Sequence, residues 1–204
     1  MKRMIFLFIT VISGCEKINE SAPQYNDYAC YKKTESENSQ SQYYLGLFYE
    51  KGIVLEKNSD KAHKYYLLSA ESGNPTAQNR LGKWASPSIN RKESLKWHTL
   101  AAKQGISESL LAAGMLNEGD RNYTEAYKYY LLAKRFNNFD KDSLLYNLQF
   151  TNKMIESSEK NLTPSEREII STEAAEWTPD YSYVTGKFKS ETLEIINCLK
   201  STAP

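Results

Sequence analysis

Apolar and small side chains recur at helical spacing in three stretches that lie 32 residues apart. In register these stretches are NSDKAHKYYLLSAESG, NRKESLKWHTLAAKQG and NYTEAYKYYLLAKRFN, residues 58–73, 90–105 and 122–137. The matching positions are Ala62, Tyr65, Leu68 and Ser69, then Ser94, Trp97, Leu100 and Ala101, then Ala126, Tyr129, Leu132 and Ala133. The pattern predicts three amphipathic helices, each about 21 Å long.

The ends of the three stretches carry helix start and stop signals. Each stretch opens with Asn, whose side chain accepts from a free backbone N–H at a helix start, and Asn90 and Asn122 have a glutamate three residues on, the spacing of a capping box. The stretches close on Gly73, Gly105 and Asn137, residues that tolerate the left-handed conformation. The helices are therefore expected to begin and end in register.

A second helix is predicted before each of these three. The segments SQSQYYLGLFYEKG, PTAQNRLGKWA and SESLLAAGMLNEG align on Gly46, Gly82 and Gly114. A glycine inside a helix costs about 1 kcal/mol relative to alanine, so its recurrence predicts a point of close approach to the partner helix. In the second helix of each pair, Tyr65, Trp97 and Tyr129 hold the same position and are expected to form the stacking core. Lys64, Lys96 and Lys128 come directly before them and are expected to lie in solvent.

The first unit, YYLGLFYEKGIVLEKNSDKAHKYYLLSAESGN, resembles a Sel1-like repeat. The matching residues are Leu45, Gly46, Tyr49, Gly52, Lys61, Ala62, Tyr65, Tyr66, Ala70 and Gly73, whereas Ser41, Val54, Leu55 and Ser69 depart from the family pattern. The resemblance covers three repeats in residues 39–138. It implies an all-α fold, an α/α right-handed solenoid of TPR-like helix pairs with capping helices.

The remainder of the chain is expected to cap this array. Residues 139–178 read as a fourth, degenerate helix pair, whose second helix starts at Thr163 with Pro164 and a capping box to Glu166. Residues 179–204 are expected to be a tail with a short helix over 190–199. Residues 27–37 are expected to form an N-terminal cap.

The N-terminus carries the features of a lipoprotein signal. A basic start and a short apolar run fill residues 1–14, and Ile12-Ser13-Gly14-Cys15 resembles a bacterial lipobox. This implies that Cys15 is lipidated, that 15–38 is a polar linker and N-terminal cap, and that the protein is tethered to a membrane without spanning it. Glu16 is not the aspartate of inner-membrane retention, which favours the outer membrane. The alternative is a signal peptide that merely ends near a cysteine.

Cys30 and Cys198 are the two cysteines that remain. An envelope compartment permits disulfides, and the tail is long enough to return to the N-terminal segment. A Cys30–Cys198 disulfide and two unpaired buried thiols are both compatible with the sequence.

Charge and motifs argue against several function classes. Lys and Arg number 26 against 25 Asp and Glu, which gives no excess positive charge for nucleic acid. The sequence has no phosphate loop, Cys-x-x-Cys or nucleophile elbow, and only two histidines, His63 and His98. We therefore expect no catalytic residues, no metal site and no cofactor.

A protein partner is the remaining expectation. By analogy with related repeats, the first helices line the concave face, where variable side chains could anchor a partner. The candidates are Tyr43, Tyr44, Leu47, Lys51, Arg80, Lys83, Met115 and Glu118, with Asn79 and Leu111 beside them. Each could instead pack between helices. Among lipoproteins of this kind, one role is periplasmic immunity to a type VI secretion lipase toxin; the alternative is a scaffold or adaptor for endogenous partners.

Overall fold

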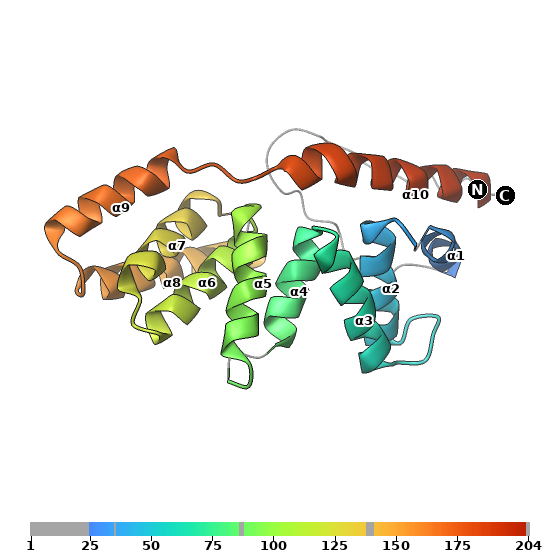
Figure 1. Cartoon of the computed structure of the whole chain (residues 1–204), viewed down its shortest axis with the longest axis horizontal. Helices are drawn as coiled ribbons and strands as arrows, with labels where there is room; N and C mark the ends of the chain where they lie inside the picture. Colours follow the sequence, from blue (N-terminus) through green and yellow to red (C-terminus); the bar gives the residue numbers. More distant parts are fainter. Residues whose placement is uncertain (1–24, 35, 86–87, 138–140, 203–204) are drawn as a thin grey trace.

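The computed structural model describes residues 25–34, 36–85, 88–137 and 141–202, and every regular element in these ranges is helical. The predicted all-α solenoid is confirmed: Figure 1 shows successive helices stacked side by side. The elements are α1 (Tyr25–Lys33), α2 (Ser39–Lys51), α3 (Ser59–Glu71), α4 (Pro75–Trp84), α5 (Arg91–Lys103), α6 (Ser107–Gly119), α7 (Tyr123–Arg135), α8 (Lys141–Glu159), α9 (Pro164–Glu176), the π-helix η1 (Tyr183–Phe188) and α10 (Lys189–Thr202).

Asparagine side chains start the helices of the repeats. Asn58, Asn74 and Asn90 each accept from a backbone N–H of the first turn, as does Asn38 before α2. The capping box predicted at Asn122 is wrong, because its side chain bonds Asn117 and Thr124 instead. The box between Thr163 and Glu166 is present and starts α9.

The recurring glycines mark the closest contacts between paired helices. A Cβ at Gly114 would lie 2.5 Å from the ring of Tyr130, and one at Gly82 would lie 2.7 Å from the ring of His98. Gly46 meets the ring of Tyr66 in the same way. The prediction of close approach is confirmed.

The stacking core lies one residue later than predicted. Tyr66 and Tyr130 are fully buried, whereas Tyr65 and Tyr129 are only half-buried. The second aromatic of each Tyr-Tyr pair faces the glycine of its own first helix, and the first aromatic lies on the flank of the helix. In the second repeat His98 takes the buried position, and the neighbouring Trp97 is buried as well.

The C-terminal segment returns along one edge of the array (Figure 1). We call residues 177–202 the strap: a non-helical stretch at 177–181, then η1 and α10. It passes the helix ends in reverse order, with Trp177 against Phe136, Pro179 against Gly105 and Tyr183 against Gly73. The Asp180 N–H also donates to the carbonyl of Lys103 over 2.8 Å. The tail is therefore an integral layer of the fold.

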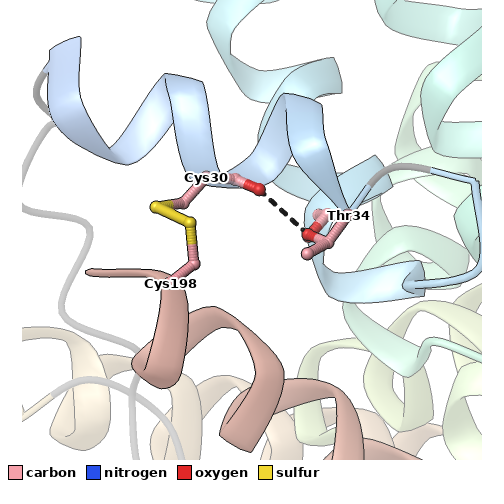
Figure 2. Close-up of a disulfide and its surroundings, with 4 residues drawn as sticks. Cys30, Thr34 and Cys198 are labelled. Atoms are coloured by element: carbon pink, nitrogen blue, oxygen red, sulfur yellow. Dashed lines mark hydrogen bonds between the residues drawn. A yellow bond between two sulfur atoms is a disulfide. The ribbon is translucent and has the colours of Figure 1, made fainter. Parts of the chain in front are cut away.

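A disulfide joins the first described helix to the last. Cys30 in α1 and Cys198 in α10 are bonded across a sequence separation of 168 residues (Figure 2). Cys30 is fully buried, and its carbonyl accepts from Thr34 Oγ1 over 3.0 Å. The array is consequently closed into a covalent ring.

Candidate protein-binding surface

The structure removes Tyr43 and Leu47 from the candidate surface. Both side chains are buried, with exposed fractions of 3% and 4%. The reason is that α2 is packed by α1, α3 and α10, so little of its surface remains open. The prediction that these two side chains meet a partner is wrong.

Three further candidates are half-buried, and each contacts a side chain of a neighbouring helix. Tyr44 stacks on Tyr31 with ring centroids 4.6 Å apart. Arg80 Nε lies 3.6 Å from Glu50, which also accepts from Tyr66. Glu118 accepts from the Tyr130 hydroxyl over 2.8 Å. These side chains hold neighbouring helices together.

Lys51, Lys83 and Met115 are the predicted residues that remain exposed. Lys83 and Met115 each follow the repeat glycine, so they hold the same position on successive first helices. Lys83 pairs with Glu108 of α6, and Asn79 donates to the same carboxylate oxygen over 2.9 Å. Met115 lies seven residues after Glu108, on the same face of α6. We name Asn79, Lys83, Glu108 and Met115 the α4–α6 patch.

The α4–α6 patch contains the Lys83–Glu108 ion pair and an exposed apolar side chain, Met115. Burial raises the pKa of Glu108, but the hydrogen bonds from Lys83 and Asn79 outweigh it and hold the pKa below its usual value. Glu108 therefore stays ionised at neutral pH. Met115 is 48% exposed beside this pair.

Sequence reasoning missed Glu108 and Trp84. Glu108 in the third repeat pairs with Lys83 in the second. The spacing of residues within one helix cannot predict such a contact between repeats. Trp84 is 37% exposed, although Phe48 and Leu116 at the same repeat position are buried. The cause is that α4 ends at Trp84, two residues after its glycine, where α2 and α6 run on for five. Pro87 was the available signal for this early end.

His98 belongs to the interior. Its Nδ1 lies 3.2 Å from Ser109 Oγ, which donates to Asn79 over 2.8 Å. Burial, reinforced by the charge of Lys83, lowers the pKa of His98 to about 4. The ring is therefore neutral at pH 7. Both His98 and Ser109 are buried, so this pair is closed to a substrate as it stands.

Two kinds of feature are absent from the described part of the chain. No three His, Cys, Asp or Glu side chains gather as metal ligands would. No helix there has the length and apolar character needed to cross a membrane.

The stacked helix pairs define a helical-repeat protein. The Sel1 repeat model matches residues 39–74, 75–106 and 107–135. The chain therefore contains three Sel1 repeats, as its residues predicted. Repeats of this family are generally protein–protein interaction modules.

Similar proteins share the repeats over part or most of the chain. A sel1-like repeat-containing protein of Acanthamoeba polyphaga mimivirus is 37% identical over 95 residues, which are 46% of this chain and 18% of that protein. A Sel1 repeat protein from Oxalobacter formigenes is 19% identical, with a TM-score of 0.49 over 84% of this chain and 85% of its own. A protective antigen of uropathogenic Escherichia coli with an SLR fold is 22% identical, with a TM-score of 0.39 over 87% and 44%.

Proposed function

We propose that this chain is a lipid-anchored envelope protein without catalytic activity that binds a partner protein through the α4–α6 patch. The observation that carries the proposal is the patch itself: an exposed methionine on the same face of α6 as Glu108, which pairs with Lys83 of α4. Methionine adapts its shape to an apolar partner surface, and ordered charges select the partner.

The disulfide supports an envelope location. Disulfides persist in oxidising compartments such as the bacterial periplasm and are rare in the cytosol. The Cys30–Cys198 bond is thus compatible with the lipobox-like sequence before Cys15. Cys15 and residues 1–14 lie outside the described residues.

Capture with matched variants tests the patch. A soluble form starting at Glu16 is used to capture partners from envelope extract. Met115→Asp should abolish capture of the partner, because it places a charge in the contact. Leu68→Asp is the control: Leu68 is similarly exposed, at 40%, but lies on α3. Equal capture by both variants would remove the patch from the proposal.

The anchor is tested separately. Cys15→Ala should move the protein from the membrane fraction to the soluble fraction, since the acyl chains supply the membrane affinity. Cys30→Ser should leave the protein in the membrane fraction. Membrane association that survives Cys15→Ala contradicts the anchor.

The partner proposed first is a secreted antibacterial lipase, to which this protein would give immunity in the periplasm. In that case its gene should lie beside a type VI lipase gene, and deletion should kill the cell only when the lipase is active. A neighbourhood without such a toxin would favour the second candidate, a scaffold or signalling adaptor for endogenous proteins. Both candidates bind through the same surface.

A further inference from the structure

The two cysteines of the disulfide differ in their exposure to solvent. Cys30 is fully buried, whereas Cys198 is half-buried and lines a surface hollow with Lys33, Thr34, Glu194 and Asn197. A thiolate attacks a disulfide at whichever sulfur it can reach. The hollow therefore directs an external thiol to Cys198 Sγ, and the Lys33 ammonium at its wall favours the approaching thiolate.

The contacts that the disulfide secures are largely polar. The Glu191 carboxylate accepts from the Ser39 N–H over 2.9 Å and from its hydroxyl over 2.7 Å. Asn38 Nδ2 donates to the Glu191 carbonyl over 2.9 Å. Water replaces such hydrogen bonds when the surfaces separate, so they resist opening less than the covalent bond does. Among the described residues of α10, Ile195 adds a buried apolar contact, in a cluster with Tyr31 and Phe48.

The other end of the strap is held more firmly. Trp177 packs into the apolar cluster of α7 and α9, and Arg135 donates to the carbonyls of Ala174 and Trp177 over 2.7 and 2.8 Å. The non-helical residues 177–181 lie between this anchorage and η1. When the disulfide is cut, the strap can turn at these residues while α9 stays in place.

We propose that the Cys30–Cys198 disulfide is a redox latch, opened by a dithiol that attacks Cys198, and that its opening releases α10 from the N-terminal end of α2. The dithiol thiolate forms a mixed disulfide with Cys198, and Cys30 leaves as a thiolate that takes up a proton. The second thiol of the dithiol then attacks the mixed disulfide. It releases Cys198 as a thiol and becomes a cyclic or intramolecular disulfide, so two electrons pass from the dithiol to the protein. The inference does not depend on the α4–α6 patch binding a partner.

The experiment combines thiol labelling with hydrogen exchange. In the Cys15→Ser variant only Cys30 and Cys198 remain, and the protein is treated with dithiothreitol at neutral pH without denaturant. Maleimide should label both thiols. At exchange times short enough for α6 and α7 to stay protected, exchange should quicken on the order of tenfold or more in 183–202 and at the start of α2. A Cys30→Ser, Cys198→Ser variant should show the same exchange pattern without dithiol.

Charge variants test the route of attack. Lys33→Ala should slow reduction by roughly two- to fivefold, the range of an exposed charge interaction. Lys189→Ala is the matched control, an exposed lysine that does not line the hollow, and should leave the rate unchanged. A disulfide that is reduced only in denaturant overturns the latch, as does reduction without faster exchange or with exchange at short times throughout the repeats. If the disulfide is reduced at equal rates in the two lysine variants, the thiol does not approach through the hollow.

Discussion

Replacing Gly114 with alanine should destabilise the protein, although alanine is the better helix former. Alanine gains about 1 kcal/mol at a helix interior. Its Cβ would lie 2.5 Å from Tyr130 Cε1, about 1 Å inside ordinary van der Waals contact. The ring cannot yield easily, because it is fully buried and its hydroxyl is bonded to Glu118.

Forcing extra volume into a packed core costs about 1–3 kcal/mol. An overlap of about 1 Å places this cost in the upper part of the range, about 2–3 kcal/mol, so subtracting the helix gain leaves an expected loss of about 1–2 kcal/mol in the free energy of unfolding. The assay is equilibrium unfolding in urea followed by far-UV circular dichroism. Gly186→Ala is the matched control, because a Cβ there meets nothing within 4 Å, and it should be neutral or stabilising. A Gly114→Ala protein as stable as the parent would refute the close-approach reading of the repeat glycines.

Three other predictions follow from contacts already described. The Cys30→Ser, Cys198→Ser protein should lose about 5 kcal/mol of unfolding free energy in the chain-entropy model for a loop of this length, measured in urea against the oxidised parent; an unchanged midpoint would contradict it. Because the pKa of His98 falls from 6.5 to about 4 on folding, the unfolded chain binds more protons between these values, so stability should drop by up to about 3 kcal/mol as pH falls from 7 to 4. In His98→Gln, stability should fall less between pH 7 and pH 4 than in the parent. An equal fall in both proteins would mean that other groups cause it. Thr163→Ala removes the capping box of α9 and should cost about 1 kcal/mol, with Thr172→Ala as an exposed control inside the same helix.

Periodicity in the sequence was enough to predict the repeats. The 32-residue spacing, the asparagine caps and the recurring glycines each report a local requirement of a helix pair, and the structure has the glycines in close contact and side-chain caps at Asn58 and Asn90, though not at Asn122. The buried aromatic was misplaced by one residue, since Tyr65 and Tyr66 both fit a broad apolar stripe. Only the three-dimensional packing against Gly46 distinguishes them.

The exposed surface was harder to predict because burial depends on distant segments. The repeat pattern predicted that Tyr43 and Leu47 would be exposed. Both are buried in the packing around α2, which includes contacts with α10. The contact of Glu191 with Ser39 spans 152 residues and has no periodic signature. Lys83 and Met115 are exposed at the same repeat position at which Leu47 is buried, so the repeat position alone does not determine exposure.

The strap also limits how this array can evolve. Solenoids commonly change length by gaining or losing whole units, because each unit contacts only its neighbours. Here one further helix pair would move α1 away from α10 by roughly 20 Å, at the 8 to 10 Å spacing of packed helices. Cys30 and Cys198 could then no longer meet without a longer strap. A disulfide between the two ends therefore fixes the number of repeats.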